Sequence, residues 1–362
     1  MSQAQSTRAD LVAEKVATAE LDALLVTDLV NIRWLTGYAG SNAAVVIGSG
    51  EGGFRRFLTD FRYLTVTAGL EADGWERAIA TDLLERAVSD FDGAELRLGF
   101  DDAHMSVKEH AKLESLAGER IELVAAGGVV EELRAVKDEA ELVKLRAATR
   151  LADDALTDTL SRGLAGRTEK DFALDLEFTM RRMGAEAVSF PPIVAGGEHG
   201  ALPHAEPRDV VIGERTLVVV DWGAQLDGYA SDCTRTYATG DLDPRDEEIY
   251  EIVLEAQLAA LAAIRPGLTG REVDAVAREI IDAAGHAEHF GHGLGHGVGL
   301  EVHEGPRLSK QGEAELRPGN VVTVEPGVYM PGAVGVRIED LVVVTPDGCE
   351  VLTSLPKDLQ IV

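Results

Sequence analysis

The residues with the clearest capacity for chemistry are acids that end or open predicted β-strands. Asp221 ends the apolar run 216–221, and Asp232 lies in the segment 229–237, which follows an Asp-Gly turn signal. One turn register sets Asp221 opposite Thr234 with Asp232 as its diagonal neighbour, and the other sets the two aspartates opposite each other. Both registers place the two carboxylates on the same face of the hairpin.

A second hairpin is predicted around Gly332, with strand-like residues on either side of the turn. A turn centred there places Glu325 opposite Glu339, unless the Pro-Gly pair after Glu325 inserts a bulge. Arg337 lies two residues from Glu339 and therefore shares its face of the strand. The sequence thus contains two hairpins that each present two carboxylates.

Acids in apolar strands are costly to bury without compensation, so surface exposure is the simplest alternative for each one taken alone. Four converging carboxylates would repel one another by roughly 4 kcal/mol per close pair at an effective dielectric constant of about 20. They would have to be protonated, held apart or neutralised by cations, and two divalent ions supply four positive charges. Oxygen-rich ligation with a single imidazole suits Mn²⁺, Co²⁺ or Fe²⁺ at least as well as Zn²⁺.

Histidines alternate with glycines in residues 289–304, which read HFGHGLGHGVGLEVHE. Glycine at every second position lets the backbone approach another surface closely, and the alternative is a glycine-rich turn with solvated histidines. In an extended segment His292 and His296 share one face. His303 lies an odd number of residues from His296 and would point to the opposite face, unless the intervening glycines bend the chain.

Residues 6 to 125 alternate strand-like and helix-like segments, which predicts an α/β domain. The segment NIRWLTGY at 31–38 has two interpretations: a packing element between a strand and a loop, or a contribution to the active site of a neighbouring subunit. The expected strands are 23–26, 43–47, 78–80 and 121–124, and the expected helices are 8–19, 61–72 and 106–116.

A break in the periodicity at residues 127–128 indicates a domain boundary. We place the two domains at 1–130 and 131–362. Near the start of the second domain, Asp138 and Glu141 form a helix-capping pattern that begins a long amphipathic helix.

Further helices are expected in the second domain, and glycine and proline signals bound them. One spans 168–183, a second opens at Asp243-Pro244 and stops at Pro266-Gly267, and a third ends at Gly285. The proline-rich stretch 190–207 is typical of a loop, and it carries His199 and His204.

Composition excludes several classes of partner. The 362 residues carry a formal net charge of −29, which disfavours binding to nucleic acid phosphates and to anionic membranes. The first ten residues lack a signal-peptide pattern and no apolar run reaches the length of a membrane span, so a cytoplasmic protein is expected. The cysteines, Cys233 and Cys349, are too few for a disulfide framework or a thiolate metal site, and Cys233 is expected to be a core residue.

Four motifs occur along the chain: DWGAQLDGYASDCTRT at 221–236, GHGLGHGVGLEVHE at 291–304, VEPG at 324–327 and GVRIED at 335–340. Together, and in this order, they resemble the pita-bread metallopeptidases, the family of methionine aminopeptidase, aminopeptidase P and prolidase. NIRWLTG at 31–37 is similar to the N-terminal domain of the Xaa-Pro branch. The resemblance implies an α+β protein, with a C-terminal pita-bread catalytic domain preceded by a smaller α/β domain of the creatinase and prolidase type.

The resemblance implies five metal ligands. Asp221 would bind the first ion, Asp232 and Glu339 would bridge both ions, and His296 with Glu325 would complete the second site. His204, His303 and Arg337 match positions that hold the substrate and stabilise the reacting carbonyl. His292 matches a position that lines the proline pocket. The remaining histidines of this domain have no match and are expected to be solvated: His199, His286 and His289.

The implied reaction is metal-dependent hydrolysis of the peptide bond that precedes proline, on dipeptides (Xaa-Pro dipeptidase, prolidase) or on longer peptides (Xaa-Pro aminopeptidase). Aminopeptidases are an established example of the two-metal template, in which a metal-bridging hydroxide attacks the carbonyl. Glu325 would take the proton of the water and pass it to the leaving nitrogen. Two ions per chain are expected, with Mn²⁺ preferred and Co²⁺, Fe²⁺ or Zn²⁺ as alternatives. A homodimer is also expected, whose N-terminal domain restricts substrate length.

Two alternative functions use the same fold. One is a non-peptide hydrolase related to creatinase, and the other is a peptide-binding module without catalytic activity. Creatinases share the architecture but have lost the metal ligands, whereas this sequence retains residues suited to ligation at all five positions.

Overall fold

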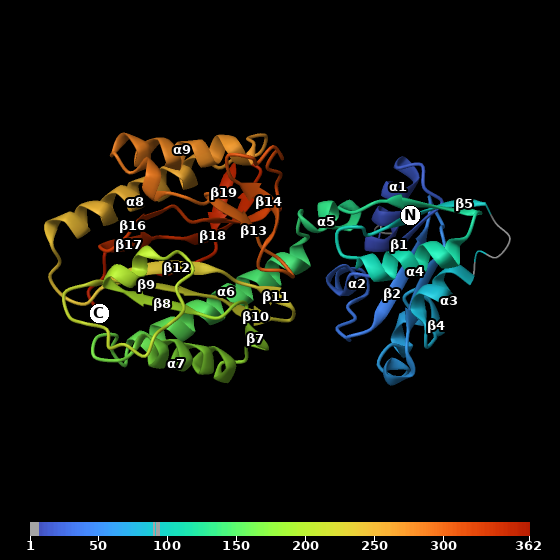
Figure 1. Cartoon of the computed structure of the whole chain (residues 1–362), viewed down its shortest axis with the longest axis horizontal. Helices are drawn as coiled ribbons and strands as arrows, with labels where there is room; N and C mark the ends of the chain where they lie inside the picture. The colour runs from blue at the N-terminus through green and yellow to red at the C-terminus, as the bar shows by residue number, and fades with distance from the viewer. Residues whose placement is uncertain (1–6, 90, 92–94) are drawn as a thin grey trace, which may run out of the picture. The chain divides into compact units, whose positions relative to one another are not determined.

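The computed structural model describes residues 7–89, 91 and 95–362. The chain forms two compact units, Met1–Arg134 and Ala135–Val362 (Figure 1). This division follows helix α5 (Val129–Arg134), whereas the boundary expected between 130 and 131 lies inside that helix. Each unit contains its own sheet structure and its own buried core.

The first unit is built on one mixed six-stranded sheet, in the order β4-β3-β2-β1-β5-β6. Strand β1 pairs antiparallel with β2 and parallel with β5. Helices α3 and α4 pack against each other, and α1 packs with α2 and α5. The elements are α1 (Arg8–Thr18), β1 (Ala23–Val26), α2 (Leu29–Thr36), β2 (Ala43–Gly48), β3 (Arg55–Thr59), β4 (Glu76–Ile79), α3 (Leu83–Ser89), β5 (Leu96–Phe100), α4 (Val107–Ala117), β6 (Ile121–Ala125) and α5.

Most of the elements predicted for this unit are present. The four expected strands correspond to β1, β2, β4 and β6, and the helices expected at 8–19 and 106–116 correspond to α1 and α4. The helix predicted at 61–72 is wrong, because two short 3₁₀ helices, Phe61–Tyr63 and Ala68–Glu71, stand in its place. The β-branched residues at 65–67 separate them, and such side chains lose conformational freedom in an α-helix.

The segment 31–38 forms most of helix α2, and its buried Ile32, Trp34 and Leu35 give it the packing role of the first interpretation, on a helix instead of between a strand and a loop. A contribution to the active site of a neighbouring subunit stays a prediction. The side chain of Asp28 caps the helix by accepting a hydrogen bond from the backbone nitrogen of Asn31. Gly37 ends the helix with a left-handed φ of 75°. An aspartate N-cap and a glycine C-cap are strong boundary signals, so the correct interpretation was present in the sequence.

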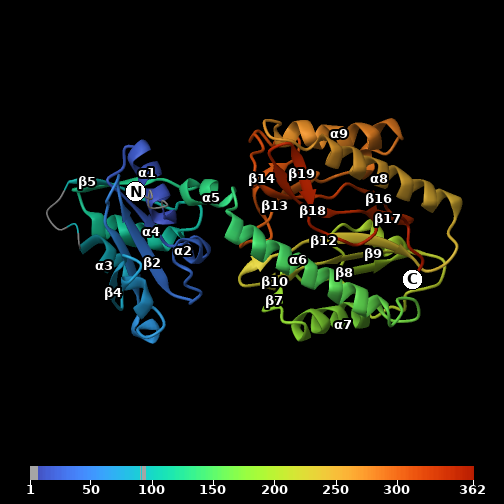
Figure 2. The same ribbon diagram turned by 180° about the vertical axis from the view of Figure 1, so that it is seen from behind.

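In the second unit, α8 and α9 lie on one side of the sheets and α6 and α7 lie on the other (Figures 1 and 2). The sheets have the strand orders β12-β9-β8, β14-β13-β15-β18-β19, β11-β10-β7 and β16-β17. The helices are α6 (Glu139–Leu160), α7 (Glu169–Arg182), α8 (Pro244–Ala263) and α9 (Gly270–Ala283). The strands are β7 (Ala187–Val188), β8 (Ile193–Gly196), β9 (Leu217–Trp222), β10 (Ala224–Leu226), β11 (Tyr229–Ala230), β12 (Cys233–Ala238), β13 (Gly295–Gly297), β14 (Glu304–Leu308), β15 (Val321–Val324), β16 (Gly327–Met330), β17 (Val334–Arg337), β18 (Asp340–Thr345) and β19 (Gly348–Val351).

The helix boundaries of this unit confirm the predicted capping signals. Helix α6 begins with a capping box between Asp138 and Glu141, and Thr168 caps α7. Helix α8 has proline in its first turn after the N-cap Asp243. Helix α9 ends just before Gly285, whose φ of 84° stops the helix.

The first predicted hairpin forms with the Asp-Gly dipeptide as its two-residue turn. Leu226 pairs with Tyr229 across that turn, between β10 and β11. Farther from the turn, β9 pairs antiparallel with β12 and Asp221 is opposite Thr234. The structure thus selects the first of the two predicted registers.

The second predicted hairpin is divided between two sheets but keeps one register. The β15–β18 ladder ends at the pair Val324 and Asp340, and the β16–β17 ladder continues in the same register. Glu325 is therefore opposite Glu339, as predicted, and the Pro-Gly pair does not shift the strands by a bulge.

Alternation along β9 explains why its acid is directed away from the core. Val218, Val220 and Trp222 belong to a hydrophobic cluster that also contains residues of α6 and α7. Side chains alternate across a strand, so Asp221 lies on the other face.

Among the described residues, no helix combines the length and the apolar character that crossing a membrane requires.

Candidate metal centre

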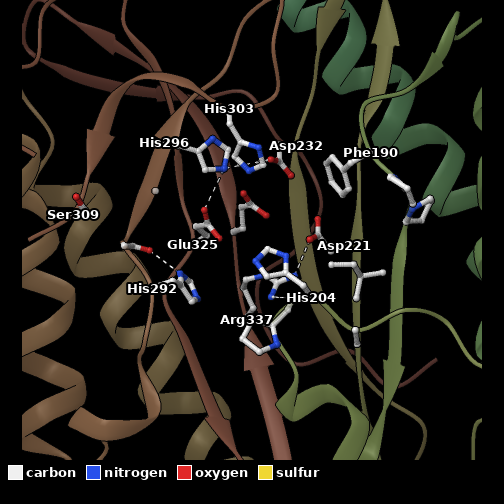
Figure 3. Close-up of a pocket in the computed structure, with 18 of the residues that line it drawn as sticks. Phe190, His204, Asp221, Asp232, His292, His296, His303, Ser309, Glu325 and Arg337 are labelled. Carbon is white, nitrogen blue, oxygen red and sulfur yellow. Dashed lines mark hydrogen bonds and ion pairs between the residues drawn. The ribbon is translucent and has the colours of Figure 1, made fainter. Parts of the chain in front are cut away.

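One cavity of about 710 Å³ in the second unit is lined by all the residues to which the family resemblance gives a role. Figure 3 shows several of them directed toward a common space from different strands and loops. They are His204, Asp221, Asp232, His292, His296, His303, Glu325, Arg337 and Glu339.

Asp221 and Asp232 come from the β9–β12 hairpin and are both buried. Oδ2 of Asp221 accepts a hydrogen bond from Nη2 of Arg337 at 2.7 Å. Its Oδ1 is buried and has no hydrogen-bond partner within the described part of the chain. A buried carboxylate oxygen without a donor is costly, so this atom marks a position where a cation would be stabilising.

Glu325 and Glu339 come from the second hairpin, and each receives a threonine hydroxyl. Oγ1 of Thr234 donates to Oε2 of Glu339 at 2.7 Å, and Oγ1 of Thr323 donates to Oε1 of Glu325 at 3.3 Å. These hydroxyl donors fix the orientation of both carboxylates. Each carboxylate keeps a second oxygen for ligation.

His296 lies on β13, and its orientation is set by a backbone contact. Its Nδ1 is 3.1 Å from the carbonyl oxygen of Gly297, which makes Nδ1 the donor and turns Nε2 toward the carboxylates. Nε2 lies 3.3 Å from Oε1 of Glu325 and 3.6 Å from Oδ2 of Asp232. Ligand atoms of Asp232, His296 and Glu339 lie within 4.8 Å of one another, a separation at which one ion can contact all three.

The close approach of β13 to β15 requires glycine. A Cβ atom at Gly295 would overlap the carbonyl oxygen of Thr323. Because the two strands lie this close, the backbone nitrogen of His296 donates a hydrogen bond to Oγ1 of Thr323 on β15 at 3.1 Å. This contact explains part of the glycine alternation seen in the sequence.

The carboxyl groups of the site differ in the direction of their pKa shifts. Burial and repulsion from Glu339 raise the pKa of Asp232 well above its ordinary value, and burial and repulsion from Glu325 do the same to the pKa of Glu339. Burial acts against ionisation of Glu325 too, but the hydrogen bond and the charge of His296 lower its pKa to about 2. The cluster therefore lacks enough positive charge of its own to keep every carboxylate ionised.

These observations fit a divalent metal centre. Four carboxylates and one imidazole are the ligand types that Mn²⁺, Fe²⁺, Co²⁺ and Zn²⁺ accept. The unpartnered oxygen of Asp221 and the raised pKa values of Asp232 and Glu339 indicate a deficit of positive charge, which bound divalent ions would remove.

His303 joins the cavity because the chain bends after β13. Residues 298–303 form a turn in which the backbone nitrogen of Gly299 donates to the carbonyl oxygen of Glu301. The ring centroids of His296 and His303 are 4.3 Å apart. The strict alternation that placed His303 on the opposite face is wrong here, because the connecting residues are not an extended strand.

Tyr329 is an important residue that the sequence analysis missed. Its Oη accepts a hydrogen bond from Nη1 of Arg337 at 2.9 Å and lies 2.9 Å from Nε2 of His292. Burial raises the pKa of Tyr329 to about 12, so the hydroxyl keeps its proton and can donate it to His292. The signal was available: Tyr329 is four residues from Glu325 in the predicted hairpin and shares its face.

Residues without a predicted role lie elsewhere. His199 is buried beside Glu169, which corrects the expectation that it is solvated. His286 and His289 are partly exposed neighbours whose Nδ1 atoms are 3.2 Å apart, and neither lines the cavity. Cys233 is buried in the hydrophobic cluster beneath α6 and α7, as expected of a core residue.

Comparison with known proteins gives similarity over nearly the whole chain. Residues 8–136 match the creatinase/prolidase N-terminal domain, and residues 143–346 match metallopeptidase family M24. An uncharacterized peptidase of Bacillus subtilis, YqhT, is 41% identical over 341 residues, which cover 94% of this chain and 95% of the relative. An Xaa-Pro dipeptidase of Pyrococcus furiosus is 43% identical over 231 residues, which cover 64% of this chain and 66% of the relative.

Solved structures agree with this result. An Xaa-Pro dipeptidase from Bacillus anthracis superposes with a TM-score of 0.93 at 38% identity, covering 98% of this chain and 99% of the other. An X-Pro aminopeptidase from Thermotoga maritima gives a TM-score of 0.86 at 36% identity, covering 96% of this chain and all of the other. The predicted resemblance and fold class are confirmed, and the chain belongs to metallopeptidase family M24, as a metallopeptidase with a creatinase/prolidase N-terminal domain.

Proposed function

We propose that this protein hydrolyses the peptide bond that precedes proline, using two divalent ions bound by the four carboxylates and His296. The observation that carries the proposal is the convergence of these buried and half-buried side chains in a cavity of about 710 Å³. Relatives named Xaa-Pro dipeptidase and X-Pro aminopeptidase support the choice of bond. Mn²⁺ is the proposed ion, because carboxylate-rich ligation suits it.

The ions would supply an activated water and polarise the scissile carbonyl. Asp232 and Glu339 would hold both ions, and Asp221 would hold one of them through the oxygen that Arg337 does not bind. Glu325, whose Oε1 lies 3.3 Å from Nε2 of His296, would accept the proton of the attacking water and pass it to the leaving proline nitrogen.

The other cavity residues bind and orient the substrate. His204 and His303 are assigned to the reacting carbonyl, where hydrogen-bond donors stabilise the developing negative charge. Nδ1 of His292 donates to the carbonyl oxygen of Gly293 at 2.7 Å, and its Nε2 accepts from Tyr329. Because both ring nitrogens are engaged, His292 presents its ring to the proline pocket and recognises shape. An Xaa-Pro bond has no amide hydrogen, so recognition by shape is appropriate.

Substrate length and assembly complete the proposal. The substrate is a small peptide with proline in the second position, either a dipeptide or a longer peptide. The protein acts as a homodimer, and the N-terminal domain restricts the length of peptide that is accepted.

The proposal is tested with three matched substrates: an Xaa-Pro dipeptide, an Xaa-Pro-Xaa tripeptide and the corresponding Xaa-Ala dipeptide. Purified protein would be assayed with added Mn²⁺ or Co²⁺. Hydrolysis of one or both proline substrates, with little hydrolysis of Xaa-Ala, is expected. Equal cleavage of Xaa-Ala, or failure to cleave either proline substrate, would refute the proposed specificity, and the ratio of dipeptide to tripeptide rates assigns the substrate length.

A further inference from the structure

Residues 196–208, which we call the His204 loop, form one side of the cavity. Pro203, His204, Ala205 and Glu206 of this loop line the cavity. Nη1 of Arg337 donates to the carbonyl oxygen of Pro203 at 3.1 Å, and Figure 3 shows His204 beside Arg337. His204 is an exposed residue, so the position of its ring depends on the conformation of the loop backbone.

Glu169, the first residue of α7, contacts both ends of the His204 loop. At the beginning of the loop, the backbone nitrogen of Gly196 donates to Oε1 at 2.9 Å, and Nδ1 of His199 is 3.0 Å from Oε2. At the end of the loop, Arg208 donates its backbone nitrogen and Nε to Oε2, both at 3.0 Å, and Nη2 to Oε1 at 2.9 Å. The carboxylate of Glu169 thus connects residues 196 and 208, which are twelve positions apart in the sequence.

The helix that carries Glu169 does not depend on this carboxylate for its cap. Thr168 caps α7 by accepting a hydrogen bond from the backbone nitrogen of Asp171. The side chain of Glu169 is only 2% exposed, and a carboxylate that leaves water needs cations and donors in compensation. Burial raises the pKa of Glu169, but hydrogen bonds from Arg208 and Gly196 lower it below its ordinary value overall.

The compensation for this buried charge comes almost entirely from the loop. Gly196, His199 and Arg208 all belong to residues 196–208. The buried charge of Glu169 therefore depends on both ends of the loop for its compensation. A change at Glu169 would leave the rest of the cavity residues intact and would act through the loop.

We propose that Glu169 is a positioning residue for the hydrolysis, because it fixes both ends of the His204 loop and thereby places His204 against the metal ligands. Glu169 is not among the described residues that line the cavity, so it acts without touching the substrate. The inference rests on the proposed function, in which His204 is assigned to the reacting carbonyl.

The decisive variant is Glu169→Gln, which preserves size and replaces one acceptor oxygen by an amide donor that faces Arg208 or His199. Asp171→Asn is the matched control. It removes a carboxylate from the same first turn of α7, but Asp171 is exposed and its side chain pairs with Arg167, outside the loop.

In the metal-loaded enzyme, Glu169→Gln is expected to lower kcat on an Xaa-Pro substrate by about 10- to 100-fold, the scale of misplacing a catalytic group by about 1 Å. Metal content should stay unchanged, and Asp171→Asn should alter kcat by less than about twofold. In a His204→Ala background, Glu169→Gln should change kcat by less than about threefold, because the two substitutions remove the same contribution. A full, multiplicative loss in the double variant would overturn the proposal.

Hydrogen–deuterium exchange provides a readout that does not depend on activity. Peptides covering 196–208 should exchange at least about tenfold faster in Glu169→Gln than in wild type, while peptides of β9 remain unchanged. Unchanged exchange in the loop would also overturn the proposal. If Glu169→Gln fails to fold, Arg208→Ala replaces it, because the Arg208 side chain is 40% exposed and can be removed at lower cost. Absence of Xaa-Pro hydrolysis in wild type, with the exchange difference present, would refute the proposed function and retain the role of Glu169 in holding the loop.

Discussion

The two units each contain a cluster of two acids and one histidine, and the clusters differ in ways that distance alone does not reveal. Asp28, His104 and Glu131 in the first unit have ligand atoms within 4.8 Å of one another, as do Asp232, His296 and Glu339 in the second. The side chains of His104 and Glu131 are 34% and 30% exposed. Those of Asp232 and His296 are 7% and 15% exposed.

The cluster of the first unit already uses its polar atoms. Asp28 accepts from the backbone nitrogen of Asn31 at 2.8 Å, and Oε1 of Glu131 accepts from the side-chain nitrogen of Asn31 at 2.7 Å. The two ring nitrogens of His104 face different acids, with Nδ1 3.9 Å from Asp28 and Nε2 3.2 Å from Glu131. No single nitrogen is therefore directed at both carboxylates of this cluster.

Electrostatics separate the two clusters further. Burial raises the pKa of Glu131, but the hydrogen bond from Asn31 lowers it below the ordinary value overall. Burial and mutual repulsion instead raise the pKa values of Asp232 and Glu339. Closely spaced ligand atoms thus indicate a metal site only where buried charge lacks compensation within the protein itself. Four predictions test this difference.

The largest expected effect is that of metal removal. Chelation of the purified protein should abolish hydrolysis of an Xaa-Pro substrate, because the clustered carboxylates then have no charge balance and no activated water is present. Addition of Mn²⁺ or Co²⁺ should restore activity, measured as initial rate against added ion. Full activity in protein shown to be free of metal would contradict the assignment.

The second prediction concerns the bridging ligands. Asp232→Asn or Glu339→Gln should reduce metal content below that of wild type, because each removes a carboxylate that is proposed to bind both ions. Elemental analysis of the purified variants measures this directly. Glu131→Gln is the matched control from the other cluster, and it should leave metal content unchanged. If Asp232→Asn or Glu339→Gln retained two ions per chain, the proposed bridging roles would be wrong.

The third prediction concerns His303, which lines the cavity but is not assigned as a ligand. His303→Ala should lower kcat by roughly 10²-fold or more, the scale of losing one donor to a developing oxyanion. Metal content should barely change, which distinguishes this residue from His296. Near-normal turnover of an Xaa-Pro substrate would show instead that His303 has a structural role.

The sequence was most informative where local pattern and chemistry coincide. Asp221 and Asp232 lie in a hairpin with an Asp-Gly turn, so their common face followed from short-range rules, whereas two registers stayed open until the structure selected one. His303 required the family resemblance, because alternation alone gave the wrong side. The contacts of Glu169 could not be predicted in this way, since they join α7 to residues 27 to 39 positions later through tertiary packing. Long-range partners of this kind leave no periodic signal in a single sequence.

The smallest expected effect is that of Asp28→Ala in the first unit. Asp28 caps helix α2, and loss of an aspartate N-cap costs about 1 kcal/mol of stability. The change should therefore lower the thermal midpoint slightly and leave both metal content and kcat on an Xaa-Pro substrate unchanged. Ser106→Ala is the matched control, because Ser106 caps α4 in the same unit without belonging to the cluster. The two variants should be alike in stability and in metal content. If Asp28→Ala lost metal while Ser106→Ala did not, the exposed cluster would be a second metal site, and burial would no longer be the property that separates the two.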